Sequence, residues 1–287
     1  MPGWAAFTGL TLVVLFVLLA LARLSQAAVG EGPPQLPSAE DDRSSVDEQP
    51  TAPPPLDEAV TITGNPDTEP DTTTVDTAKP TQSTDGELTT GALLANVALT
   101  QGLFGAVVAV AAWYFEIPKT ALGLAGGPLQ VGGPAVGLGV VLGVVLWSAN
   151  EITASLADAV GAAYDESLRE LLAPDSLGGW VLLLGVILPI IAVVEELIFR
   201  AALIGVPAAG FDISPVALAI FSSAMFALGH GAQGRAGIAV TGALGFVLAG
   251  GYVLTGSLLV VVIAHYLVNA LEFVVHEGLG LERLHAD

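Results

Sequence analysis

Hydrophobic residues gather along the chain into long runs that are separated by shorter polar segments. A bilayer core about 30 Å thick takes roughly 20 apolar residues as a helix, and open strands cannot satisfy their backbone groups in lipid. We therefore expect an all-α, polytopic transmembrane bundle of about seven helices. The expected helices cover residues 4–22, 91–115, 131–148, 179–199, 213–229, 236–254 and 257–275.

Residues 25–89 break this pattern. The segment carries 14 acidic and 2 basic residues, is rich in Pro and Thr, and has no aromatic residue. Its hydrophobicity is too low to offset the entropy lost on ordering, so we expect a disordered acidic linker. A tether and a solvated spacer without a specific role both fit this composition.

Composition and charge limit the classes of function. The 287 residues have a net charge of −20 although only 13% of them are charged. The chain has no Cys, which excludes disulfides, thiolate nucleophiles and Cys-ligated zinc. The acidic balance argues against nucleic acid as a partner, because that partner needs a basic face. The long apolar runs indicate the lipid bilayer instead.

The pattern divides the chain into five expected parts. They are a transmembrane anchor (1–24), the disordered linker (25–89), two transmembrane helices with an interfacial amphipathic helix (90–177), a four-helix core (178–276) and a tail (277–287). A cleaved signal peptide is the alternative for the anchor, although no Lys or Arg precedes it and its apolar run is long. The amphipathic helix is expected over residues 151–172. Lys and Arg in alternate loops divide 6 to 2, so the linker and C-terminus are expected in the cytoplasm of a multi-pass cell-membrane protein.

The fourth apolar helix ends in two consecutive acids that we expect to behave differently. Glu196 and Arg200 are four residues apart, so they share a helix face and can pair. Glu195 is rotated by about 100° from Glu196. It therefore lacks this partner and can point at a different surface. An ionisable group within a membrane segment is a functional hypothesis by default.

Two later helices carry polar residues in register. Phe226 and His230 share a face of the fifth helix. On the seventh helix His265, Asn269, Glu272 and His276 fall on one stripe of an otherwise apolar surface. We expect His265 and Asn269, deep in the apolar run, to be functional. Interhelical hydrogen bonds are the preferred interpretation for the two residues near the helix end.

A free carboxylate, two imidazoles and an amide on converging helices suit hydrolysis. The carboxylate of Glu195 can take a proton from water, and a histidine can share that water or protonate the leaving amine. Asn and His N–H groups can stabilise the oxyanion of a tetrahedral intermediate. No Gly-x-Ser-x-Gly, His-Glu-x-x-His or phosphate-binding loop occurs, which disfavours serine hydrolases, thermolysin-like enzymes and nucleotide-dependent enzymes.

Three motifs in order, Glu195-Glu196-x-x-x-Arg200, Phe226-x-x-x-His230 and His265-x-x-x-Asn269, resemble the signature of the CPBP (ABI) family of membrane proteins. That family comprises type II CAAX prenyl endopeptidases, bacteriocin-processing and immunity proteins, and relatives. The resemblance covers about a third of the chain, residues 178–275. Ala201 stands where Gly often follows the motif Arg, a small change.

The resemblance implies an intramembrane endopeptidase that acts on a membrane-associated peptide or protein, CAAX-like or other. In this interpretation Glu195 activates water with His230, while His265 and Asn269 stabilise the oxyanion. Glu196, Arg200 and Phe226 would support the site.

No cofactor is expected in this version. A zinc-dependent version, with Glu195, His230 and His265 as ligands, is the alternative that the family also suggests. Two other classes stay open, a non-catalytic membrane binder and a proton-coupled transporter, because intramembrane Glu and His also build proton relays.

Overall fold

A computed structural model describes residues 1–30, 90–159 and 167–281 of the chain. Within these ranges the regular structure is entirely helical, and six helical segments are long and apolar enough to cross a membrane. The protein is therefore a multi-pass, all-α membrane protein, as the sequence pattern predicts. The predicted linker falls almost entirely outside the described residues. Of the predicted linker, only residues 25–30 are described, and they continue the first helix.

The six membrane-length segments are Trp4–Leu24, Thr90–Tyr114, Gly133–Leu156, Leu177–Phe211, Ala236–Thr255 and Leu258–Gly278. The fifth predicted helix differs, because α9 (Pro215–Gly229) has only 15 residues. At 1.5 Å per residue it is about 22 Å long. This length is too short to cross a hydrocarbon core by itself, and His230 follows its last residue.

The helices and their bounds are as follows. The structure contains α1 (Trp4–Gly30), α2 (Thr90–Tyr114), α3 (Pro128–Val131), α4 (Gly133–Ala159), α5 (Ser167–Leu172), α6 (Leu177–Leu182), η1 (Leu183–Ile187), α7 (Leu188–Glu196), η2 (Leu197–Gly205), α8 (Val206–Phe211), α9, η3 (Gly231–Gln233), α10 (Gly234–Thr255), α11 (Leu258–Glu272) and η4 (Phe273–Gly278).

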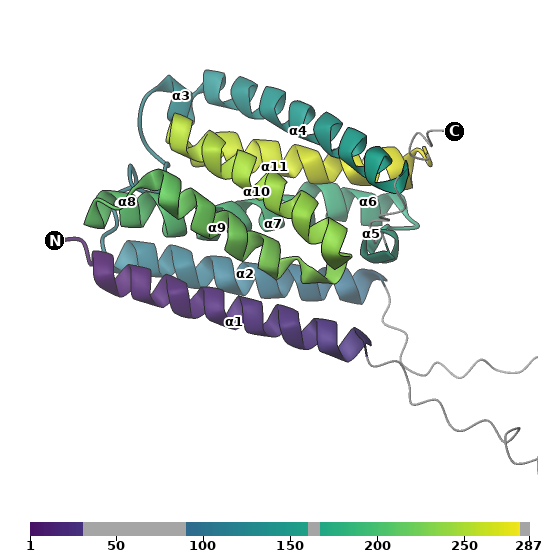
Figure 1. Cartoon of the computed structure of the whole chain (residues 1–287), viewed down its shortest axis with the longest axis horizontal. Coiled ribbons are helices and arrows are strands. Elements are labelled where there is room, and N and C mark those ends of the chain that lie inside the picture. Colours follow the sequence, from purple (N-terminus) through teal and green to yellow (C-terminus); the bar gives the residue numbers. More distant parts are fainter. Residues whose placement is uncertain (31–89, 160–166, 282–287) are drawn as a thin grey trace, which may run out of the picture. The chain divides into compact units, whose positions relative to one another are not determined.

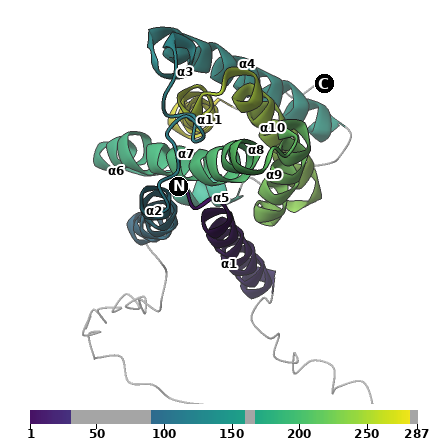
Figure 2. The same cartoon turned by 90° about the vertical axis from the view of Figure 1, so that its left-hand side faces the viewer.

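The helix α11 lies at the centre of the bundle. It packs against α4, α7 and α10, while α9 packs against α10 and α2 packs against α7. Figure 1 shows α2, α4 and α11 lying roughly along one direction, and Figure 2 shows α11 nearly end-on among its neighbours. The polar stripe of α11 therefore faces other helices, as four polar groups on an apolar helix require.

The first helix belongs to this bundle. Phe7 is fully buried on α1, and the Gly3 amide donates to the Phe115 carbonyl oxygen at the end of α2 (2.7 Å). A Cβ atom at Gly210 of α8 would lie 2.7 Å from the Trp4 indole. These contacts are those of a packed transmembrane helix. Its retention in the mature protein stays a prediction.

Helix ends follow local sequence signals. Ser176 accepts the Gly179 amide at the start of α6, and Ser257 accepts the Val260 amide at the start of α11. Such serine caps satisfy amides that have no intrahelical acceptor. Gly256 ends α10 with φ of +62°, a left-handed conformation that glycine adopts without strain.

The predicted amphipathic helix over residues 151–172 is described at its two ends, and both ends are helical. Residues 151–159 continue α4, and α5 begins at Ser167. The segment therefore does not begin as a helix of its own, because its apolar spacing is equally compatible with an extension of the preceding transmembrane helix. Residues 160–166 lie outside the described part of the chain.

Candidate active site

A cavity of about 520 Å³ lies between the helices of the bundle. Its walls come from α2, α7, α9, α10 and α11, with side chains from the end regions of α4 and α5. Glu195, His230, His265 and Asn269 all line it, and so does Phe226. The structure therefore brings the four predicted catalytic residues to one interhelical cavity, whose size is typical of small-molecule and peptide sites.

The pair Glu196–Arg200 lies beneath the cavity wall. Both side chains are fully buried, and a Glu196 carboxylate oxygen lies 3.1 Å from Arg200 Nε, as their spacing predicts. Arg200 Nη2 donates to the Gly245 carbonyl oxygen at 3.1 Å, and its guanidinium carbon lies 4.7 Å from the centre of the Phe226 ring. Arg200 thereby fixes α7 and η2 against α9 and α10.

The helix type changes within the motif Glu195-Glu196-x-x-x-Arg200. Glu196 ends α7, and Arg200 lies in the π-helix η2. Short π-helical segments occur frequently at functional sites because they rotate the following side chains relative to an α-helix. The segment η2 is fully buried from Ile198 to Ile204. Arg200 therefore lies within a buried stretch of the chain.

Glu195 has partners, contrary to the sequence-based interpretation of an unpaired carboxylate. Gln101 of α2 donates from Nε2 to Glu195 Oε1 at 3.4 Å. Glu195 Oε2 lies 3.7 Å from His265 Nε2, and 13% of the Glu195 side chain is exposed. The interpretation was wrong because helix spacing identifies partners only along one helix, whereas Gln101 comes from another. The sequence signal was an amide in the middle of the second apolar run.

His265 connects the two consecutive acids of α7. Its Nδ1 lies 2.7 Å from Glu196 Oε1, while Nε2 faces Glu195. A carboxylate oxygen accepts, so Nδ1 carries a proton, and a neutral His265 has its lone pair on Nε2. The ring can therefore offer an N–H on the Glu195 side only as an imidazolium.

His230 and Phe226 form an adjoining part of the cavity wall. His230 Nδ1 donates to the Phe226 carbonyl oxygen at 2.8 Å, which leaves Nε2 as the nitrogen that can exchange a proton with a ligand. The Phe226 ring centre lies 4.5 Å from that of His230 and 6.0 Å from that of His265. Phe226 thus packs against both imidazoles and Arg200, which explains why an aromatic residue suits this position.

A second polar cluster lies where α4, α5 and η4 meet. Asn150 donates to Glu272, and His276 Nε2 lies 3.0 Å from Glu151 Oε1. These contacts are the interhelical hydrogen bonds expected for Glu272 and His276. Three cluster residues, Asn150, Arg169 and Glu272, also line the cavity that holds Glu195 and His265.

Arg169 of α5 belongs to the same cluster. Only 14% of its side chain is exposed, because Nε donates to Glu277 at 2.8 Å and Nη1 donates to Glu272 at 3.3 Å. Charged residues on an amphipathic segment predict a polar face but do not reveal that α5 turns this face toward η4.

The zinc alternative requires Glu195, His230 and His265 to offer three ligand atoms to one ion. Within the described ranges, the group of three potential ligands whose atoms all lie within 4.8 Å of one another is a different one, at the C-terminal end of α11. The described geometry therefore does not gather the predicted ligands into one metal centre. His265 does have one feature of a metal ligand, an Nδ1 proton bonded to a carboxylate.

Fold and site together define a multi-pass helical membrane protein with an interhelical cavity lined by carboxylate, imidazole and amide groups. The sequence model of the Rce1-like family, type II CAAX prenyl endopeptidases, matches residues 177–271. This match runs from α6 to nearly the end of α11, agrees with the resemblance seen in the three motifs, and supports a membrane endopeptidase at the level of the family. No curated protein and no solved structure matches the chain.

Proposed function

We propose that the protein is an intramembrane endopeptidase that hydrolyses a peptide bond of a membrane-associated substrate in the cell membrane. The observation that carries this proposal is the convergence of Glu195, His230, His265 and Asn269 on one cavity, within a region of the Rce1-like family. A cavity between membrane helices favours a substrate that reaches it from the bilayer or its surface.

In the proposed reaction Glu195 acts as the general base. Its carboxylate faces the cavity and accepts a hydrogen bond from Gln101, so its orientation is set before substrate binds. It takes a proton from water, and the resulting hydroxide attacks the carbonyl carbon of the scissile bond. His230, through Nε2, hydrogen-bonds the same water. The proton then passes to the leaving amine as the carbon–nitrogen bond breaks.

His265 and Asn269 are proposed to stabilise the oxyanion of the tetrahedral intermediate. They lie one helical turn apart on α11, and both line the cavity. Because Nδ1 of His265 is bonded to Glu196, the donor toward the oxyanion is the Nε2–H of the imidazolium.

The supporting residues act through this arrangement. Glu196 orients His265, and Arg200 balances the charge of Glu196. Phe226 holds the imidazoles of His230 and His265 on separate parts of the wall. We propose a metal-free mechanism, and the zinc version with Glu195, His230 and His265 as ligands is the competing proposal for the same site.

The test is peptide cleavage by purified protein in proteoliposomes. The probe is a fluorogenic farnesylated peptide ending in a CAAX sequence, assayed beside the same peptide without its prenyl group. Glu195→Gln and His230→Ala are expected to abolish cleavage, while Glu116→Gln, an exposed carboxylate outside the cavity, retains it. Unchanged cleavage in the first two variants removes this site as the catalytic centre.

Metal dependence is a separate measurement on the same preparation. Two results together support the metal-free mechanism. The protein keeps full activity in strong chelator, and its zinc content does not change in His230→Ala. The zinc version is tested in the variant His276→Gln, which lacks the histidine of the second polar cluster. It is supported if this variant loses activity in chelator and regains it with one equivalent of zinc. Glu195-dependent uptake of substrate without any cleavage would instead support a transporter.

A further inference from the structure

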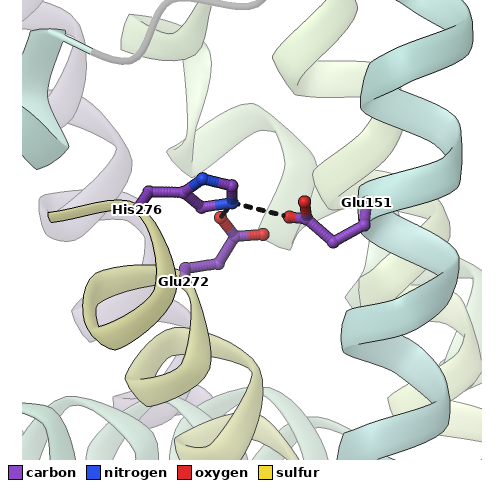
Figure 3. Close-up of side chains that lie close together, drawn as sticks. All are labelled: Glu151, Glu272 and His276. Atoms are coloured by element: carbon purple, nitrogen blue, oxygen red, sulfur yellow. Dashed lines mark hydrogen bonds and ion pairs between the residues drawn. The ribbon is translucent and has the colours of Figure 1, made fainter. Parts of the chain in front are cut away.

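We propose that Glu151, Glu272 and His276 form a binding site for a divalent transition-metal ion, with Zn²⁺ as the best-suited ion. Glu151 comes from α4, and the other two residues come from the end of α11 and from η4. Figure 3 shows the three side chains pointing toward one another. One atom from each lies within 4.8 Å of the other two. This inference goes beyond the proposed peptidase activity and does not depend on it.

The orientation of His276 is the first argument. Its Nδ1 lies 2.8 Å from the carbonyl oxygen of Leu281, so Nδ1 carries the proton and donates it. In a neutral ring the lone pair is then on Nε2, which faces two carboxylates. Only 6% of the His276 side chain is exposed. A ring that donates one N–H to a backbone carbonyl and turns its other nitrogen to acidic groups has the usual geometry of a metal-bound histidine.

The spacing of the atoms is the second argument. His276 Nε2 lies 3.0 Å from Glu151 Oε1 and 3.5 Å from Glu272 Oε2. Ligands at about 2.0–2.2 Å from a tetrahedral zinc ion are separated by about 3.4 Å from one another. The two separations from His276 Nε2 are close to this value, and the two carboxylates each offer an oxygen within 4.8 Å of the other, so an ion can be held after small movements of the side chains. One imidazole and two carboxylates leave the fourth position to water.

Charge is the third argument. Glu151, Glu272 and Glu277 face the cluster with three carboxylates, and Arg169 supplies one positive charge. Among these described side chains carboxylates outnumber the one guanidinium, an excess that a divalent cation can balance. Asn150 and Arg169 hold the Glu272 carboxylate in place, and such outer contacts orient metal ligands. A proton on His276 Nε2 is the competing explanation for the same contacts.

The location gives the ion a consequence for the protein. It would join α4 to the α11–η4 segment, and Glu272 lines the same cavity as Glu195. The ion would therefore fix one end of the cavity without contacting the proposed catalytic residues. The chemistry of a mixed imidazole–carboxylate set favours zinc over Mg²⁺ or Ca²⁺, which prefer oxygen ligands only.

The test is zinc binding by tag-free, chelator-treated protein in detergent, measured by calorimetry and by elemental analysis after desalting. We expect one equivalent of Zn²⁺ per chain. Glu151→Gln and His276→Gln should each weaken binding by about 100-fold or more, since even outer-shell changes cost 10–100-fold. Glu195→Gln and His230→Gln should bind as the wild type does.

X-ray absorption at the zinc edge separates this site from a catalytic zinc centre. One imidazole ligand supports the Glu151–Glu272–His276 site, and two imidazoles point to His230 with His265 and overturn the proposal. A wild-type protein that binds no zinc at tens of micromolar overturns it as well, because the contacts are then ion pairs of a protonated His276. Circular dichroism and gel filtration confirm that each variant is folded.

Discussion

The buried Glu196 carboxylate is expected to contribute more to stability than its neighbour Glu195, although Glu→Gln is the same change at both. Glu196 is fully buried and contacts Arg200 at 3.1 Å and His265 at 2.7 Å. Glu196→Gln keeps the volume of the side chain but leaves the buried guanidinium of Arg200 without the carboxylate that it contacts. Removing one partner of a buried ion pair destabilises proteins by about 3–5 kcal/mol.

The matched substitution Glu195→Gln should have a small effect. Its side chain retains some exposure, and its contact with Gln101 is long at 3.4 Å. We expect a loss of about 1 kcal/mol or less. For a domain of this size 1 kcal/mol shifts the unfolding temperature by roughly 2–4 °C. The predicted difference between the two variants is then on the order of 10 °C.

Thermal unfolding in detergent, followed by intrinsic fluorescence, measures this difference. The double variant Glu196→Gln/Arg200→Met removes both charges and should regain part of the stability lost in Glu196→Gln, because no unpaired buried charge remains. Equal unfolding temperatures for Glu196→Gln and Glu195→Gln, or a double variant less stable than Glu196→Gln, would refute the assignment of a buried ion pair.

Three further changes test the packing around the site. Gln101→Leu should lower the cleavage rate about tenfold, which corresponds to about 1.4 kcal/mol of activation free energy, with little change in unfolding temperature. An unchanged rate would mean that Gln101 does not orient the base. Gly105→Ala should destabilise the protein by about 1–3 kcal/mol, because the new Cβ would lie 2.5 Å from a side-chain carbon of α7. The control is Gly102→Ala, whose new Cβ would have nothing within 4 Å. Equal unfolding temperatures for the two variants would contradict the close α2–α7 contact. Phe226→Ala should cost about 3–5 kcal/mol, and a stable variant would contradict its packing between Arg200 and the two imidazoles.

Helix location followed closely from the sequence, because crossing a bilayer imposes a minimum length of apolar chain. Two segments differ from the predicted helices, and each difference has a physical cause. The helix α9 is too short to cross alone, since its apolar run ends at His230, which lies at the cavity. The segment after residue 151 continues α4, because apolar spacing does not mark where a helix leaves the membrane.

The sequence predicted those contacts of the site that join two residues about one turn apart on the same helix. Glu196 and Arg200 pair as expected because four residues make about one turn. The partners of Glu195 and Glu272 lie far away in the sequence, in Gln101 and Asn150. A single sequence does not state which helices are neighbours, so these contacts required the structure.

The inferred metal site changes how chelation experiments should be interpreted. Loss of activity in chelator would not by itself demonstrate a catalytic zinc ion, because an ion at Glu151, Glu272 and His276 would support one end of the same cavity. Chelator sensitivity that persists in His276→Gln indicates zinc at the catalytic residues. Sensitivity that disappears in this variant indicates the cluster.

The central claim is that Glu195 activates water to cleave a peptide bond. Single-turnover cleavage of the farnesylated peptide in ¹⁸O-labelled water measures this directly, with the product read by mass spectrometry. With Glu195 as the base, the new carboxyl terminus carries one labelled oxygen in the wild-type reaction, and the rate is at least about 100-fold lower with Glu195→Gln. Labelled product formed by Glu195→Gln at the wild-type rate would contradict this claim.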